Sequence, residues 1–274
     1  MTKQRKKEKS EKEGAVKLVL NEISPITETQ EKVWHFWQKN YNLVLDGAAG
    51  SGKSFIALYL CLEKIVNQGE RKQIVIIRSP QATSQVGFLP GTLQEKESAY
   101  MLPYVSIVNE LFKDSTAFKT LEQAGIIKFM TTAFIRGISL HDCYVIVDEM
   151  QNCTEHELDS VITRAGRNTR YIFTGDYRQS DLERDRDRCG ILEFLKIVDH
   201  LKYFKKLTFT WEDVVRSGIV RDYLMVKEMF YQAKLNGQPE PKPELTDVNN
   251  ELSQSKEENV SGESEIIYDD DNLK

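Results

Sequence analysis

The chain has no long apolar run. No stretch approaches the roughly 18 consecutive apolar residues that cross a membrane, and the lysine-rich N-terminal residues lack the apolar core of a signal peptide. We therefore expect the protein to stay in the cytoplasm. Its hydrophobic content of 40% is still enough to build a core.

Residues that bind transition metals or form disulfides are also scarce. The four cysteines are scattered without a C-x-x-C pair: Cys61, Cys143, Cys153 and Cys189. This pattern predicts reduced thiols rather than disulfides or a zinc site. The four histidines share no H-E-x-x-H or other ligand spacing, which argues against metal ligation by histidine.

Net charge is missing from the middle of the chain and is concentrated at its ends. Residues 1–14 hold six Lys or Arg against three Glu, and residues 238–274 hold eleven Asp or Glu against three Lys. Because the whole chain carries −5, residues 15–237 have no net charge. The composition predicts a disordered basic tail at 1–14, one folded domain at 15–237 and a disordered acidic tail at 238–274.

The chain does contain a complete G-x-x-x-x-G-K-[ST] phosphate loop. Its eight residues are Gly47, Ala48, Ala49, Gly50, Ser51, Gly52, Lys53 and Ser54. They lie between the apolar run 43–45 and a helix-like stretch at 55–65, the strand–loop–helix context that this motif requires. Glycines let backbone N–H groups approach a triphosphate, Lys53 reaches its β- and γ-phosphates, and Ser54 supplies a Mg²⁺ ligand. The loop therefore predicts ATP and Mg²⁺ as cofactors.

A second motif adds the groups needed for hydrolysis. The apolar, strand-like run 144–147 ends in Asp148 and Glu149, which is typical of a Walker B motif. The 95 residues from Lys53 to Asp148 leave room for several βα units between neighbouring strands of one parallel sheet. Asp148 can hold Mg²⁺, and Glu149 can orient and deprotonate water. The alternative is that both acids merely cap the following turn.

A third strand-like run, 171–174, ends in Gly175 and Asp176, with Gln179 three residues further on. Ligands bind at the carboxyl ends of parallel strands, so the three strand ends at Gly47, Asp148 and Gly175 should meet at one crevice. Gln179 is then placed to sense the γ-phosphate. Taken alone, Gly-Asp followed by Gln is ordinary loop composition.

Strand-like and helix-like segments alternate along the core, which predicts an α/β fold. Strands are expected at 43–45, 73–78, 126–131, 143–147, 170–174 and 204–210, and helices at 27–38, 53–67, 103–113, 154–166, 189–199 and 219–235. Thr154 and Glu157 have the spacing of a capping box, so the helix at 154–166 should carry Arg164 on its last turn.

Several segments together resemble the PhoH-like ATPases. Besides the phosphate loop, these are DEMQN at 148–152, TGDYRQ at 174–179, RSP at 78–80 with GFLPG at 87–91, and IRG at 135–137. The similarity covers about residues 25 to 235, and GFLPG together with DEMQN is more specific than any phosphate loop.

The resemblance implies a RecA-like P-loop NTPase domain with a mostly parallel sheet flanked by helices. It also implies kinship to the motor cores of superfamily 1 helicases and assembly into a homo-oligomeric, hexameric ring. In such a domain Gln30 would read adenine, and Arg216 or Arg164 would be an arginine finger. The chain departs from the family at Met150, where Ala is common, and at 217–218, where Ser-Gly replaces His-Pro.

Two functions from different classes remain open. One is an ATP-driven motor on RNA or single-stranded DNA, for which the candidate contacts are Arg78, Phe88, Lys96 and Arg136. The other is a nucleotide-dependent regulatory or assembly protein without translocation. Some relatives carry an N-terminal PIN nuclease domain, but only about 24 residues precede the adenine-reading segment, so nuclease activity is not expected.

Overall fold

The computed structural model describes residues 18–47, 49–80, 93–177, 185–215, 218–237 and 239. The predicted tails lie outside these ranges apart from Pro239, so their disorder remains a prediction. The chain divides into two compact units, residues 1–225 and 226–274, and the helix Gly218–Leu235 (α8) runs from the first into the second. The predicted domain limits of 15 and 237 likewise remain predictions.

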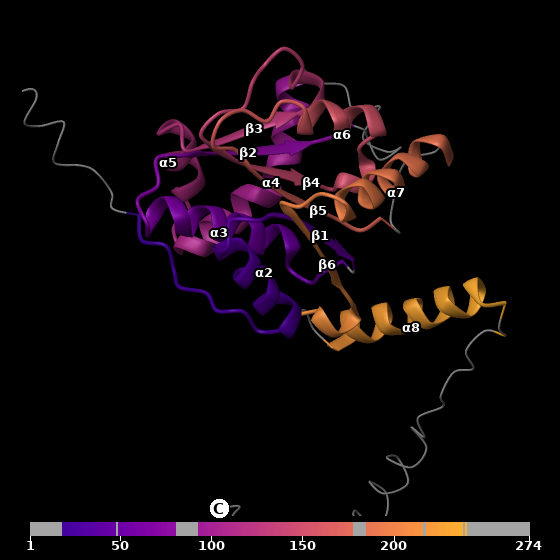
Figure 1. Cartoon of the computed structure of the whole chain (residues 1–274). Helices are drawn as coiled ribbons and strands as arrows, with labels where there is room; N and C mark the ends of the chain where they lie inside the picture. The colour runs from indigo at the N-terminus through magenta and orange to yellow at the C-terminus, as the bar shows by residue number, and fades with distance from the viewer. Residues whose placement is uncertain are drawn as a thin grey trace, which may run out of the picture. The chain divides into compact units, whose positions relative to one another are not determined.

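Six strands in the described part of the chain form one parallel sheet. They are β1 (Asn42–Gly47), β2 (Gln73–Arg78), β3 (Ile127–Thr131), β4 (Cys143–Asp148), β5 (Arg170–Gly175) and β6 (Phe204–Phe209). Their order is β3-β2-β4-β5-β1-β6, and the labels in Figure 1 follow this order from top to bottom. Every pairing is parallel, as expected where helices connect successive strands. The predicted α/β fold with a mostly parallel sheet is confirmed.

One expectation about the sheet is wrong. Strand β5 lies between β1 and β4, so the strand before the phosphate loop and the strand before Asp148 are not neighbours. Both pair with β5 instead, through Asp46 opposite Gly175 and Val147 opposite Phe173. The phosphate loop and Asp148 therefore face each other across the end of β5.

The helices lie on both faces of the sheet because its strands are apolar on both. These helices are α2 (Glu28–Gln38), α3 (Lys53–Val66), α4 (Leu93–Phe112), α5 (Ala117–Gln123), α6 (Glu155–Ile162) and α7 (Asp185–Asp199). Three short 3₁₀ helices are η1 (Thr132–Phe134), η2 (Met150–Asn152) and η3 (Trp211–Asp213). Helices α2 to α5 pack on the face that carries Leu43 and Leu45, and α6 and α7 pack on the face that carries Val44. None of the helices described is long and apolar enough to span a bilayer.

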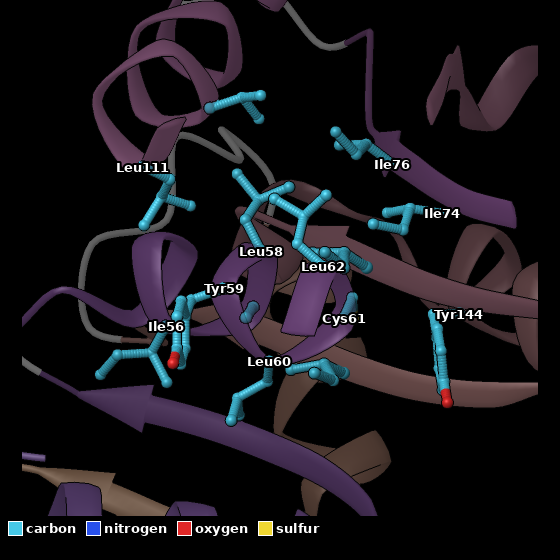
Figure 2. Packing of buried hydrophobic residues seen from close by; sticks show 14 of the residues in the cluster. Ile56, Leu58, Tyr59, Leu60, Cys61, Leu62, Ile74, Ile76, Leu111 and Tyr144 are labelled. Atoms are coloured by element: carbon cyan, nitrogen blue, oxygen red, sulfur yellow. The ribbon is translucent and has the colours of Figure 1, made fainter. Parts of the chain in front are cut away.

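Helix α3 is deeply buried. Seven consecutive residues, Ile56 to Leu62, are buried, so the helix is apolar all round rather than on one stripe. Figure 2 shows Leu58 and Leu62 pointing toward the side of Ile74 and Ile76 on β2, with Leu60 pointing the opposite way. Each leucine buried in this way stabilises the fold by about 2 kcal/mol. The packing fixes the helix whose first residues are Lys53 and Ser54.

Three predicted helix limits are wrong and one helix was missed; the first wrong limit is the start of α7, which begins at Asp185 rather than 189. Helix α4 begins at Leu93 rather than 103, because Pro103 lies inside the helix and not at its first turn. Helix α5, a short helix between Asp114 and β3, was not predicted. Helix α6 ends at Ile162, since the backbone after it leaves the helix to pair with Leu140. The amide of Leu140 donates to Arg164 O at 2.9 Å, and the amide of Gly166 donates to Leu140 O at 2.7 Å.

Candidate nucleotide-binding site

The phosphate loop joins the end of β1 to the start of α3. Gly50 and Gly52 have φ of 80° and 81°, a left-handed conformation that side chains disfavour. Helix α3 begins at Lys53, and its first turn presents backbone N–H groups and the positive end of the helix dipole. This is the local geometry of an anion site. Ala48 lies outside the described residues.

Lys53 is buried beneath the loop. Its Nζ donates to Gly47 O at 2.8 Å and to Ser51 Oγ at 3.4 Å. Burial lowers the pKa of Lys53, whereas the negative charges of Asp176 and Asp46 act in the opposite direction. Lys53 thus lies close to the carboxylates at the ends of β1 and β5.

Asp148, at the end of β4, accepts hydrogen bonds from three hydroxyl groups. Ser54 Oγ donates to its Oδ1 at 2.7 Å, and Thr174 Oγ1 donates to the same oxygen. Tyr104 Oη, from α4, donates to Oδ2 at 2.7 Å. Burial, followed by the charge of Asp148, raises the pKa of Tyr104, so the phenol remains a donor. Ser54 and Asp148 are therefore in direct contact, although 94 positions separate them in the chain.

Glu149 is held in an unusual backbone conformation. Its φ of 53° and ψ of 45° lie in the left-handed region, which is uncommon for a residue with a side chain. Gln151 Nε2 donates to Glu149 Oε2, and Gln151 Oε1 accepts from the Asp176 amide at 3.1 Å. Burial and the charge of Asp148 raise the pKa of Glu149, whereas the bond from Gln151 lowers it. Gln151 therefore links the acid to the end of β5.

These groups line one cavity of about 790 Å³, within the roughly 300–1,000 Å³ of small-molecule sites. Its polar wall includes Ala49, Gly50, Gly52, Lys53, Ser54, Arg78, Asp148, Glu149, Gln151 and Asp176. The cavity has cations and helix amides for phosphate, and a hydroxyl and a carboxylate for a hard metal ion. In the part of the chain described, no group of three or more His, Cys, Asp or Glu could hold a metal. Two oxygen ligands nevertheless fit Mg²⁺, which takes its remaining ligands from phosphate and water.

The cavity lining also includes apolar side chains and Gln30. The apolar side chains are those of Ile23, Ile26, Trp34, Phe55, Pro103 and Ile107. Gln30 is 4% exposed, and its Oε1 accepts from the Ile26 amide at 2.9 Å. Thr27 caps α2 by accepting from the Gln30 amide, so the start of the helix fixes the glutamine at the wall. Adenine reading by Gln30 remains a prediction, and the structure brings the residue to the cavity that this role requires.

Of the two predicted arginines, Arg164 does not line this cavity. Arg164 lies beyond the end of α6, so its placement on the last helical turn is wrong. It lines a separate open hollow with Glu155, His156 and Asp159. Arg216 and Gln179 lie outside the described residues, so nothing here places either one.

The cavity residues that were not predicted for this site include Tyr104, Gln151 and Arg78. Tyr104 lies inside a helix whose start was misplaced, and its hydroxyl has no sequence signature. Gln151 belongs to the DEMQN segment, which could have suggested a role. Arg78 is predicted above as a nucleic-acid contact, whereas the structure places it opposite Asp148 on the neighbouring strand and in the nucleotide cavity.

The parallel sheet, phosphate loop and acidic strand end define a P-loop NTPase-type domain. Residues 22–228 match the family profile described as PhoH-like protein. The chain therefore belongs to the PhoH-like protein family.

Named relatives agree with this assignment. A PhoH-like protein of Bacillus subtilis (strain 168) is 34% identical over 176 residues, covering 64% of this chain and 54% of the relative. One of Synechocystis sp. (strain ATCC 27184 / PCC 6803 / Kazusa) is 31% identical over 197 residues, covering 72% and 58%. Among solved structures, the large terminase of a thermophilic bacteriophage is 14% identical with a TM-score of 0.45, covering 74% of this chain and 50% of that one. The chain spans about half the length of the curated relatives it matches.

Proposed function

We propose that this chain binds ATP with Mg²⁺ and hydrolyses it. The observation that carries the proposal is the meeting of Lys53, Ser54, Asp148 and Glu149 at one cavity. They come from the start of α3 and the end of β4, and the contact between Ser54 and Asp148 joins the two elements. A nucleotide triphosphate, a divalent ion and an attacking water need these groups side by side.

Each residue has a separate task in this proposal. The helix amides and Lys53 hold the phosphates, and Ser54 and Asp148 hold the ion. When bound, Mg²⁺ would neutralise phosphate charge as it develops. Glu149 orients water and takes its proton, for which a raised pKa is favourable near neutral pH. Gln151 keeps the Glu149 carboxylate directed toward the end of β5.

The test is nucleotide binding and turnover measured on the same protein. We expect the wild type to bind ADP by calorimetry and to release phosphate from ATP only with Mg²⁺. Lys53→Ala should lose both activities. Lys64→Ala is the matched control, since Lys64 lies on the same helix and bonds to exposed Gln68. If the wild type binds no ADP at millimolar concentration, the proposal is wrong.

We further propose that copies of the chain form a ring that acts on RNA or single-stranded DNA. The proposal is supported by the family and by two exposed groups beyond the carboxyl end of β3. Phe134 is 52% exposed, and Arg136 nearby is exposed as well, so an aromatic ring and a cation are available together. Such pairs bind bases and phosphates of single strands. Phe88 lies outside the described residues, and nothing is described of the Lys96 side chain.

The competing proposal is a regulatory or assembly protein that uses ATP without moving along nucleic acid. The core has no net positive charge, which favours this alternative. The ATPase rate with and without single-stranded RNA or DNA, together with native mass, separates the two. A motor should be stimulated, and Phe134→Ala with Arg136→Ala should lose the stimulation while keeping the basal rate. An ATPase rate that neither RNA nor DNA changes supports the proposal of a regulatory or assembly protein.

A further inference from the structure

The carboxylate of Asp148 is held from three directions. Its Oδ1 accepts from Ser54 on α3 and from Thr174 on β5, and its Oδ2 accepts from Tyr104 on α4 at 2.7 Å. Three different elements thus converge on one side chain. Tyr104 is the hydroxyl donor that the structure gives to Oδ2.

The main chain of Asp148 needs no further support. Strand β4 is buried along its length between β2 and β5, and Arg78 pairs with Asp148 in the parallel register. The carboxylate itself is less constrained, because the terminal torsion of an aspartate has a broad, nearly two-fold preference. Hydrogen bonds to both oxygens are what fix its orientation.

All three bonds are compatible with a metal ion in the site. Ser54 is the proposed ion ligand, and its oxygen could hold the ion through a lone pair while its proton is still donated to Asp148. Thr174 would remain on Oδ1 and Tyr104 on Oδ2. Tyr104 holds Oδ2, the oxygen that neither Ser54 nor Thr174 contacts, and it does so from a helix that also lines the cavity.

The Tyr104 side chain is itself closely packed. It is 1% exposed, and its ring packs against Phe129 with centroids 5.9 Å apart. Val108 and Leu111 of the same helix belong to the core cluster around it. Two other buried tyrosines have partners outside this site: Tyr144 donates to Glu70 at 2.5 Å, and Tyr171 donates to Val161 O at 3.1 Å.

We propose that Tyr104 is a positioning residue for the metal, holding the Asp148 carboxylate in the orientation that the nucleotide-bound ion requires. This rests on the proposed function. Partners of metal ligands typically change metal affinity about 10- to 100-fold when removed, because they orient the ligand. The role couples α4, through one phenol, to metal binding at the end of β4.

The experiment compares the full chain with Tyr104→Phe and uses Mn²⁺ as a spectroscopic probe. The first measurement is the Mn²⁺ dissociation constant of the protein–ADP complex by electron paramagnetic resonance. The second is ADP affinity in EDTA, by calorimetry. We expect Mn²⁺ binding to weaken about 10-fold or more, with metal-free ADP affinity and melting temperature close to wild type. Tyr144→Phe, which removes the buried hydroxyl at Glu70, should change neither constant.

Two results would overturn the inference. One is Mn²⁺ binding by Tyr104→Phe as tight as that of the wild type. The other is an equal loss of ADP affinity in EDTA, which would show general loosening of the cavity. If Tyr104→Phe fails to fold, Tyr104→Met is tested by the same measurements. Methionine fills the buried position with an unbranched apolar side chain that has no hydroxyl. A wild type that binds neither ADP nor Mn²⁺ would refute the proposed function; a wild type that binds both, beside an unaffected Tyr104→Phe, refutes only the role of Tyr104.

Discussion

The backbone oxygen of Phe209 lies where a side chain at Gly47 would begin, since a Cβ added there would be 2.0 Å from it. The two residues are paired at the ends of β1 and β6, and Gly47 has a φ of 123°. Only a residue without a side chain allows β1 to pair with β6 at this point. The first glycine of the phosphate loop is therefore required for strand pairing as well as for phosphate binding.

Gly47→Ala should therefore destabilise the protein, by about 3 kcal/mol or more, because neither backbone can move without breaking the pairing. Gly69→Ala is the control, since Gly69 also has positive φ but has nothing within 4 Å of the added Cβ. Strain alone should cost about 1 kcal/mol there. Urea unfolding of both variants measures the loss in free energy of unfolding. Equal losses for Gly47→Ala and Gly69→Ala would show that the strands can shift to accommodate a side chain at Gly47.

Lys53→Ala and Glu149→Gln should fail in different ways. Removing Lys53 takes away phosphate binding, so ATP affinity and turnover should fall together. Glu149→Gln keeps the shape of the side chain but removes the base. It should therefore still bind ATP, while its turnover rate should fall by about 10²- to 10⁴-fold. Filter binding of labelled ATP and phosphate release measure the two quantities. Hydrolysis by Glu149→Gln at the wild-type rate would contradict the role given to Glu149.

An arginine from a neighbouring copy is expected to complete the site. Arg216 is the first candidate, from the family motif. Arg164 is the second, and it does not line the nucleotide cavity of its own chain, so it would be available to the cavity of a neighbouring chain. A finger acting between chains typically adds about 10³-fold or more in rate. Arg216→Ala and Lys53→Ala chains, each inactive alone, should regain some ATPase activity when mixed, because one interface then pairs an intact loop with an intact arginine.

Arg164→Ala mixed with Lys53→Ala serves as the comparison for Arg216. Activity should also rise more than linearly with protein concentration over the range of assembly, followed by native mass. Full and concentration-independent specific activity in a monomer would rule out both the ring and the finger.

The acidic tail should be dispensable for the chemistry. Residues 238–274 contain too few apolar side chains to form a core, so their loss should leave the folded part intact. A chain ending at Gly237 should keep the melting temperature and the basal ATPase rate of the full chain. A large fall in either value would mean that the tail binds the rest of the protein.

The sequence predicts the local parts of the site well because their chemistry is local. Gly52, Lys53 and Ser54 are adjacent, and their spacing follows from the geometry of a loop around phosphate. Strands β2 and β4 are also predicted within one residue, since both are apolar runs with sharp ends. These features need no knowledge of distant contacts.

The missed features depend on tertiary contacts. Pro103 is typical of a first helical turn, yet α4 begins ten residues earlier. The pairing of Leu140 with the 164–166 segment ends α6 early, and the neighbouring residues in the sequence give no sign of it. The hydroxyl of Tyr104 reaches Asp148 over 44 positions in the chain. Local patterns cannot supply such information.

Under the proposed function, the left-handed backbone at Glu149 places stability and activity in opposition. A side chain in this region costs on the order of 1 kcal/mol relative to glycine, and this one is also a buried acid beside another acid. Selection for folding alone would favour glycine or asparagine at this position. A search for heat-resistant variants of this chain should therefore converge on position 149 and return proteins that are more stable and inactive, so that an acid at 149 records selection for turnover rather than for the fold.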